Sequence, residues 1–276
     1  MSAAETIKTL EEKAKELRFH IIDMIFTAQS GHPGGSLSAA DIMTALYFHF
    51  LKIDPENPRN PDRDRFVLSK GHACPVWYAC LALRGFFPVE ELHTLRKINS
   101  RLQGHPVAGK LPGIDATSGS LGVGFGQAVG MALEAKMTGK SYHVYSLLGD
   151  GECNEGVVWE ACNAANKYRL NNLTAIVDCN GLQNDGFCRD IMPLEPLDLK
   201  FESCGWKVLK INGHNMEEIV SALEEAQKSQ DKPTVILAKT IKGKGLSFME
   251  NVRGWHGKPP NQEEYLKAIE EIRRAK

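Results

Sequence analysis

The stretch HVYSLLGDGECNEG, residues 143–156, contains the pattern that decides the fold. The run HVYSLL is apolar and of strand length, the triplet GDG breaks it, and residues 155–168 have helical spacing. The order then repeats, because residues 173–177 form a second apolar run that ends at Asp178-Cys179-Asn180-Gly181. A strand, a helix and a second strand form a crossover unit, whose two parallel strands end at the same edge of a sheet.

Other segments extend this pattern. Residues 66–68, 206–211 and 234–239 are expected strands, and residues 75–84 and 217–229 are expected helices. Strands that alternate with helices pair in parallel, and helices then cover both faces of the sheet. The sequence therefore predicts an α/β fold with a doubly wound parallel sheet flanked by helices.

The first half of the chain is less regular. Apolar positions at helical spacing predict an amphipathic helix over residues 6–29. Ser38, with Asp41 three residues later, resembles a capping box that opens a second helix. The polar, proline-broken residues 53–64 and the glycine-rich stretch 104–126 are expected loops.

Length and charge bound the organisation of the chain and its partners. The 276 residues show neither an internal repeat nor a flexible linker, so a single domain is expected over 1–276. It has an N-terminal helical segment at about 1–30 and a C-terminal helical tail at about 261–276. The 33 Lys and Arg against 34 Asp and Glu give a net charge of -1, which offers no electrostatic case for nucleic acid or an anionic membrane. No run approaches the roughly 20 apolar residues of a membrane span.

The cysteines and the N-terminus indicate the compartment. Seven cysteines is an odd number, and none forms a C-x-x-C pair. This usage favours reduced thiols over a disulfide framework or a zinc site. The start, MSAAETIKTLEEKAKEL, is charged and lacks the apolar core of a secretory signal. We therefore expect a cytoplasmic protein.

The ends of the two central strands carry the candidate site. Asp150 and Asn180 follow neighbouring strands, so both are expected at the sheet edge where such folds bind ligands. Carboxylate and carboxamide oxygens are hard ligands for Mg²⁺ or Ca²⁺, and Mg²⁺ completes its shell with water and phosphate oxygens. Glycines beside Asp150 let backbone N–H groups approach a phosphate. The two residues together predict a metal–diphosphate site, whereas Asp150 alone also fits a helix N-cap and Asn180 alone fits a turn.

A nicotinamide dinucleotide site is the competing interpretation of the glycines. The run GSLGVGFG at residues 119–126 superficially resembles its fingerprint. After Gly122 and Gly124, however, the third glycine of the fingerprint falls on Gln127. The preceding residues 113–118 are also not an apolar strand. The register therefore disfavours this interpretation.

Short sequence motifs along the chain indicate which family of metal–diphosphate proteins the chain resembles. GDG followed about 30 residues later by Asn, each after a strand, resembles the thiamine diphosphate motif. The words that accompany it, in chain order, are SGHPG (30–34), RFVLSKGHA (65–73), GHP (104–106), TSGSLGVG (117–124), LLGDGECNEG (147–156), AKTIKGKG (238–245) and WHGKP (255–259). As a set they resemble the transketolase family over nearly the whole chain, and the resemblance implies its thiamine diphosphate-binding fold.

The resemblance implies roles residue by residue. It places these histidines at the substrate, as catalytic residues: His32, His105 and His256. It places these residues at the cofactor: His72, Gly119, Ser120, Leu121, Gly151, Glu155, Asn180, Lys242 and His256. The metal, Mg²⁺ or else Ca²⁺ or Mn²⁺, would be held by Asp150, Asn180 and the backbone carbonyl of Leu182. Imidazoles suit the catalytic positions because they donate or accept protons near neutral pH.

Several residues have simpler interpretations or depart from the family. His214, before an expected helix, is assigned a capping or surface role, and Glu155 also fits a favourable charge in a first helical turn. Lys239 is expected to be a solvated charge. Val123 and Gly35 stand where many members of the family have Gln and some have Ser, which concerns fine contacts and substrate choice rather than the cofactor.

The resemblance also implies a partner. In the family, a second, pyrimidine-binding domain supplies the glutamate that activates the cofactor and the groups that hold the sugar phosphate, and only 20 residues follow His256 here. We therefore expect the amino-terminal subunit of a split transketolase, with a separate C-terminal subunit in an α₂β₂ assembly. Together they would transfer a two-carbon ketol unit from a ketose phosphate to an aldose phosphate.

Other functions stay open at this point. They are a 1-deoxyxylulose-5-phosphate synthase-like or 2-oxoacid-type thiamine enzyme, an inactive cofactor-binding regulatory subunit, and a truncated fragment. The donor is not readable from the sequence, because the expected phosphate-binding residues lie in the partner; a sulfonated or branched sugar is compatible with it.

Overall fold

Five parallel strands form one sheet in the computed structural model, which describes residues 2–275. In chain order the strands are β1 (Arg65–Leu68), β2 (Val144–Gly149), β3 (Leu173–Cys179), β4 (Lys207–Asn212) and β5 (Thr234–Lys239). Their order across the sheet is β1-β2-β3-β5-β4, and every neighbouring pair is parallel. The expected α/β fold with a parallel sheet is confirmed.

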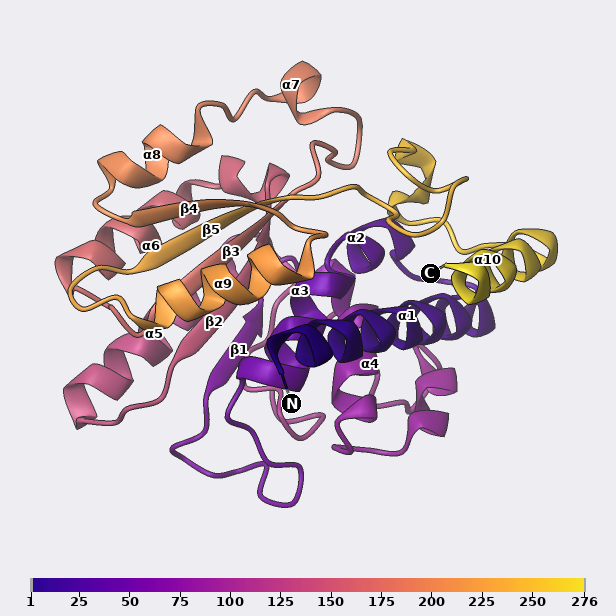
Figure 1. Ribbon diagram of the computed structural model, residues 1–276, viewed down its shortest axis with the longest axis horizontal. Coiled ribbons are helices and arrows are strands. Elements are labelled where there is room, and N and C mark those ends of the chain that lie inside the picture. The colour runs from indigo at the N-terminus through magenta and orange to yellow at the C-terminus, as the bar shows by residue number, and fades with distance from the viewer. Residues whose placement is uncertain (1, 276) are drawn as a thin grey trace.

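Helices cover both faces of the sheet (Figure 1). The first face lies against α1 (Ala3–Ala28), α3 (Ala40–Ala45), α4 (Cys74–Leu83) and α9 (Met216–Gln227). The second lies against α5 (Val123–Thr138), α6 (Gly156–Lys167) and α8 (Leu197–Ser203). Because strand side chains alternate in direction, Leu147 joins the first core and Leu148 the second. This burial on both faces explains why the central strands β2, β3 and β5 are mostly apolar, whereas the edge strand β4 is more polar.

Shorter elements and the C-terminal helix complete the chain. They are α2 (Pro33–Ser38), α7 (Cys188–Ile191), α10 (Gln262–Arg274), a π-helical turn (Leu46–Phe50) and 3₁₀ turns at Gly71–Ala73, Val89–Thr94, Gly151–Asn154 and Arg253–His256. The expected tail is helical through Arg274, and residue 276 lies outside the described residues. Helix α10 packs on α1, where the Tyr265 and Phe26 rings stack 4.1 Å apart.

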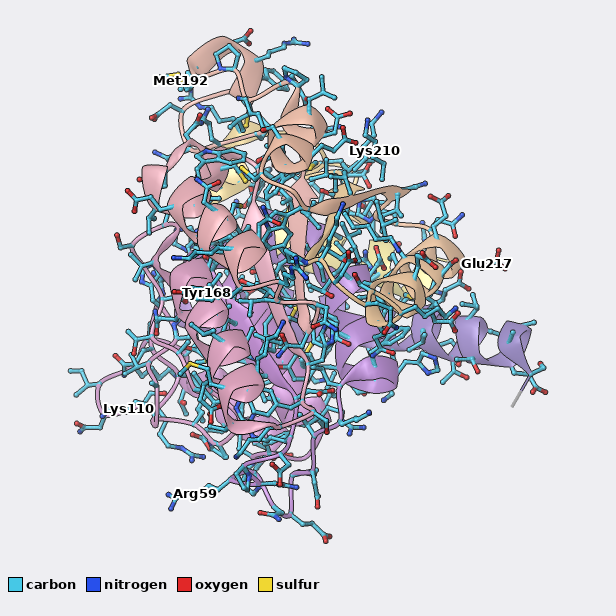
Figure 2. The ribbon with its side chains drawn as sticks, turned by 90° about the vertical axis from the view of Figure 1, so that its left-hand side faces the viewer. Arg59, Lys110, Tyr168, Met192, Lys210 and Glu217 are labelled. Carbon is cyan, nitrogen blue, oxygen red and sulfur yellow. The ribbon has the colours of Figure 1, made fainter. Side chains whose placement is uncertain are left out.

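The ends of the molecule are formed by loops. Met192, after α7, lies at the opposite end from Arg59, which is in the loop before β1 (Figure 2). That loop confirms the expected irregular segment 53–64. None of the helices in residues 2–275 has both the length and the apolarity needed to cross a bilayer.

Two expectations from the sequence are wrong. Ser38 does not cap a helix: it ends α2, and its hydroxyl donates to the Asp178 carboxylate at 2.5 Å. The expected loop 104–126 ends at Gly122, because α5 begins at Val123. Gly124 lies within this helix and permits close packing, since a Cβ there would lie 2.8 Å from the Cα of Ser69.

Asp41, in α3, connects α1 with the loop before α9. Its carboxylate accepts two hydrogen bonds from the Arg18 guanidinium, at 2.9 and 2.6 Å, and lies 2.8 Å from Nδ1 of His214. Burial opposes ionisation of Asp41, but the attraction of Arg18 and the hydrogen bond to His214 outweigh it and lower its pKa to about 2. His214 also accepts from the backbone N–H of Ile241 at 2.8 Å, which supports a structural role for this histidine.

Replacing Asp41 with asparagine should remove a pH-dependent part of the stability. The folded-state pKa of about 2 lies below the ordinary value of 3.8, so the contribution is present above about pH 4 and is lost as the pH falls to 2. The shift corresponds to about 2 kcal/mol. Urea denaturation between pH 6 and pH 3 should show the stability gap between the wild type and Asp41→Asn narrowing as the pH falls, with the exposed Asp190→Asn variant measured as the control. A constant gap for Asp41→Asn would contradict this.

Candidate functional site

The loops after β2 and β3 meet at the carboxyl edge of the sheet. Gly149 of β2 pairs with Asp178 of β3, so the two strands end side by side. Asp150 then accepts backbone hydrogen bonds from Gly151 at 2.7 Å in its own loop and from Gly181 at 2.6 Å in the next. The expected meeting of the GDG and CNG loops is therefore found, with one carboxylate connecting them.

A cavity of about 440 Å³ lies at this edge. The expected site residues that line it are His72, Gly119, Leu121, Asp150, Gly151, Glu155, Asn180, Leu182, Lys242 and His256. The lining in residues 2–275 does not include Ser120, His32 or His105. Ser120 is exposed beside it, and the two histidines belong to a cluster at its border. Segments spread over more than 200 residues of sequence thus converge on one space.

Four histidines form that cluster. The ring of His32 lies 5.2 Å from His72, 5.4 Å from His256 and 6.5 Å from His105, measured between ring centroids. Burial, followed by neighbouring positive charge, lowers the pKa of His32 and of His256 to about 4 and that of His72 well below its usual value. The pKa of the more exposed His105 is lowered for the same reasons. These imidazoles are therefore neutral at physiological pH.

Lys242 is a buried cation at the cavity wall. Its ammonium donates to the carbonyl of Leu182 at 3.2 Å and lies 2.8 Å from Nδ1 of His256. Burial, and then the charge of Lys70, lower its pKa to about 8. An anionic ligand in the cavity would favour the charged form of Lys242, so the electrostatics suit a diphosphate.

Lys70 is a cavity residue that the sequence reasoning missed. It is fully buried and forms an ion pair with Asp178, which also accepts hydrogen bonds from Ser38 and Thr240. Burial opposes ionisation of Asp178, but Lys70 and these donors lower its pKa below the usual value. Asp178, near the end of the otherwise apolar strand LTAIVDC, was the signal that could have revealed Lys70. A charge buried in a sheet needs a partner of opposite charge.

This ion pair sets the orientation of Asn180. The Nδ2 group of Asn180 donates to Asp178 at 3.1 Å, while its Oδ1 accepts from the backbone N–H of Leu182 at 3.0 Å. An ionised Asp178 carboxylate has no hydrogen to donate, so it must face the NH₂ group of Asn180. The amide nitrogen therefore points toward the sheet. The oxygen that would bind a metal therefore lies on the other side.

Glu152 is a second cavity residue that the sequence reasoning missed. Its buried carboxylate accepts from the hydroxyl of Ser69 at 2.5 Å and from the backbone N–H groups of Gly122 at 2.7 Å and Gly149 at 3.0 Å. These partners lie in the loop after β1, in the glycine loop before α5 and at the end of β2. Glu152 therefore holds the glycine loop before α5 against the loops after β1 and β2.

The residues present fit a metal-bound diphosphate. Asp150, Asn180 and the Leu182 carbonyl offer hard oxygens, and a site with one carboxylate suits Mg²⁺, which keeps water and phosphate oxygens in its shell. Burial, and then the charge of Asp178, raise the pKa of Asp150 to about 6 because both disfavour its ionised form. A bound cation would stabilise that form. Among residues 2–275 there is no cluster of three His, Cys, Asp or Glu side chains that would hold a metal by itself.

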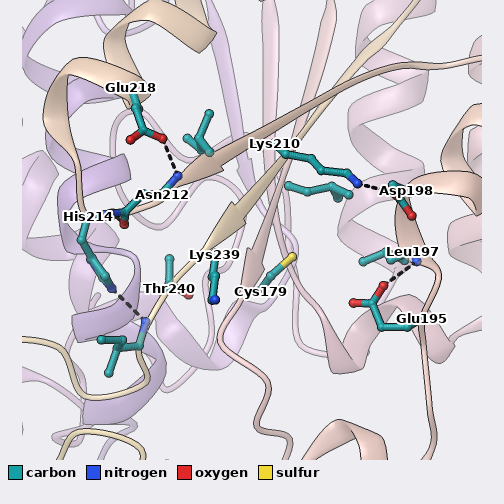
Figure 3. Close-up of a pocket in the computed structure, with 13 residues that line it drawn as sticks. Cys179, Glu195, Leu197, Asp198, Lys210, Asn212, His214, Glu218, Lys239 and Thr240 are labelled. Atoms are coloured by element: carbon teal, nitrogen blue, oxygen red, sulfur yellow. Dashed lines mark hydrogen bonds and ion pairs between the residues drawn. The ribbon is translucent and has the colours of Figure 1, made fainter.

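A larger pocket of about 790 Å³ lies elsewhere, at the ends of β4 and β5 (Figure 3). The charged and polar groups that Figure 3 joins by dashed lines are already paired within the chain. Lys210 pairs with Asp198, and Glu218, Glu195 and His214 accept from the backbone N–H groups of Asn212, Leu197 and Ile241. Lys239 is exposed there, as expected. None of the residues assigned to the cofactor, metal or substrate lines this pocket, so size alone does not identify the site.

Comparisons with known proteins identify the family of the chain. Residues 9–273 match the family described as "Transketolase, thiamine diphosphate binding domain". The chain is 46% identical to the 6-deoxy-6-sulfo-D-fructose transketolase subunit SqwG of Clostridium sp. (strain MSTE9), over 95% of this chain and 96% of that protein. It is 40% identical to an apulose-4-phosphate transketolase subunit of Phocaeicola vulgatus, over 96% of this chain and 94% of that protein.

A solved structure extends the comparison to the fold. The crystal structure of transketolase from Campylobacter jejuni superposes with a TM-score of 0.91 and 39% identity, over 96% of this chain. The match spans only 43% of that transketolase chain. The sequence motifs and the fold thus agree, and this chain belongs to the transketolase family, in which it matches the thiamine diphosphate-binding domain.

Proposed function

We propose that this chain is the thiamine diphosphate-binding subunit of a two-chain transketolase. A separate subunit with the pyrimidine-binding domain completes the enzyme, in an α₂β₂ assembly. Two relatives named as transketolase subunits support this, because each aligns with this chain over at least 94% of its own length. The single-chain transketolase, of which this chain spans 43%, supports the same division.

The observation that carries the proposal is one cavity that combines oxygen ligands, buried lysines and neutral imidazoles. Asp150, Asn180 and the carbonyl of Leu182 hold Mg²⁺, and Lys242 and Lys70 neutralise diphosphate charge. Bound thiamine diphosphate supplies a nucleophilic carbon and an electron sink, which ketol transfer requires.

The remaining residues of the proposed site bind the rest of the cofactor and the substrate. The loop Gly119-Ser120-Leu121 lies along the cofactor, and Glu155, exposed at the cavity rim, faces the cofactor or a neighbouring chain. His72 contacts the diphosphate side. His32, His105 and His256 contact the sugar, and their neutral rings offer hydrogen bonds to its oxygens. The seven cysteines are all free thiols, which supports a reducing, cytoplasmic setting.

The substrates are proposed to be a ketose donor and an aldose acceptor, as in the exchange of pentose phosphates. The names of the relatives add two donors to the assay, 6-deoxy-6-sulfo-D-fructose and apulose 4-phosphate. Differences among donors are expected to depend on the partner subunit, which would hold the end of the sugar far from the reacting carbon.

Reconstitution tests the proposed function. The full chain is mixed with its candidate partner, thiamine diphosphate and Mg²⁺, and products are analysed with fructose 6-phosphate and the two donors above. Two-carbon transfer to an aldose phosphate is expected. Release of carbon dioxide from pyruvate would instead favour a 2-oxoacid-type or synthase-like enzyme. A complex that binds the cofactor tightly and transfers nothing would overturn the proposal in favour of an inactive cofactor-binding subunit.

A further inference from the structure

Arg96 reaches the His32 ring from outside the cavity. It follows the 3₁₀ turn Val89–Thr94 and has a left-handed backbone with φ of 58°. Its Nη1 donates to the hydroxyl of Ser30 at 2.8 Å, and its Nη2 lies 3.3 Å from both Nδ1 of His32 and the carbonyl of Gly104. Ser30 and Gly104, from two separate segments, thus hold the guanidinium against one nitrogen of the His32 ring.

This contact determines which nitrogen of His32 carries hydrogen. A guanidinium has donors and no acceptor, and it stays charged at any pH at which proteins fold. Nδ1 of His32 must therefore accept, so the hydrogen of a neutral ring is on Nε2. The Nε2 edge faces Gly257, where a Cβ would lie 3.5 Å away, so the glycine leaves space beside the donor.

The surroundings keep the ring neutral. The charged or titratable groups that face it are Arg96, Lys242, His72, His105 and His256. No carboxylate is among them, so nothing in this set would favour an imidazolium. Burial and the positive charge of Arg96 are the two largest causes that lower the pKa of His32 to about 4.

We propose that Arg96 is a positioning residue that fixes His32 as the neutral tautomer with hydrogen on Nε2, so that the ring presents a hydrogen-bond donor and not a base. The tautomer follows from the contacts of the chain itself. Its use on a substrate oxygen rests on the proposed function: the Nε2–H would donate to an oxygen of the sugar that gains negative charge during carbon–carbon bond cleavage.

Gly104 provides a second way to disturb the contact. A Cβ at this position would lie 2.9 Å from Nε and 3.1 Å from Cζ of Arg96, so only glycine leaves room for the guanidinium where it lies. Gly104 has no left-handed backbone, so alanine is acceptable to the main chain. Gly104→Ala should therefore displace the guanidinium from His32 without removing its charge from the protein.

The tautomer can be read by nuclear magnetic resonance of the full chain labelled with ¹⁵N in its histidines, without substrate or partner. His32→Gln identifies the signals of His32. In the wild type, Nδ1 should have the shift of an unprotonated nitrogen and Nε2 that of a protonated one, with no change down to about pH 5. Arg96→Met should raise the pKa of His32 by about one pH unit and mix the two tautomers. Gly104→Ala should mix the tautomers with a smaller change in pKa.

The control is Arg101→Met, which removes a cation of the same segment that pairs with Glu91 at 2.6 Å and does not contact His32. It should leave the His32 signals unchanged. A wild-type ring with hydrogen on Nδ1, or a tautomer and pKa unaffected by Arg96→Met and Gly104→Ala, would overturn the proposal. These readouts do not involve ketol transfer, so they fail or succeed separately from the proposed function.

Discussion

Replacing Lys70 with methionine should lower the free energy of unfolding by about 3–5 kcal/mol, because the Asp178 carboxylate is then buried without its cation. Lys70 and Asp178 are 2% and 0% exposed, so water cannot take the place of the ammonium. Methionine has a similar length and fills the same space, so the change removes the charge and the hydrogen bond that the ammonium donates to the carbonyl of Gly35 at 2.9 Å. Urea denaturation of the full chain, followed by circular dichroism, measures the loss.

Two further variants make this test specific. Lys207→Met removes the partner of Glu225 from an ion pair on the surface, and should cost less than about 1 kcal/mol. The double variant Lys70→Met/Asp178→Asn removes both buried charges, so it should be more stable than Lys70→Met alone by about 1 kcal/mol or more. If Lys70→Met were no more costly than Lys207→Met, the buried pair would not be what holds this edge of the sheet together.

The sheet and its edge could be predicted because their signals are local. Each central strand is a short apolar run ended by glycine or asparagine, and the crossover rule alone places Asp150 beside Asn180. The words around the four histidines likewise lie in loops that the fold brings together. Local sequence was therefore enough to predict a site residue where that residue directly follows a strand or lies in a recognised motif.

The residues that support these ligands could not be predicted in the same way. Three of them lie in or near the recognised motifs: Lys70, Glu152 and Arg96. Each acts through a partner more than 20 residues away in sequence, which local patterns do not reveal. Helix α5 was missed because its glycines lower helical propensity, whereas Gly124 is present for contact with Ser69. Ser38 was misassigned because its acceptor, Asp178, is 140 residues away.

Replacing Asp150 with alanine should weaken metal-dependent binding of thiamine diphosphate on the order of 100-fold or more. Asp150 is the one carboxylate in the expected ligand set, and the other two ligands are neutral oxygens that bind a divalent cation weakly on their own. Titration calorimetry of the chain with its partner, in the presence and absence of Mg²⁺, measures the cofactor Kd. Binding of Mn²⁺ to the chain alone, followed by electron paramagnetic resonance, measures the metal separately.

The structural and the electrostatic roles of Asp150 can be separated, because its oxygens also accept from Gly151 and Gly181. Asp150→Asn keeps an oxygen for one of these N–H groups but removes the charge. It should therefore lose most of the metal affinity while keeping more of the thermal stability than Asp150→Ala. Asp190→Ala removes an exposed carboxylate that lies after β3. It should change neither the metal affinity nor the thermal stability. Tight metal-dependent binding retained by both Asp150 variants would mean that the cation is held elsewhere, and that Asp150 serves only to join the two loops.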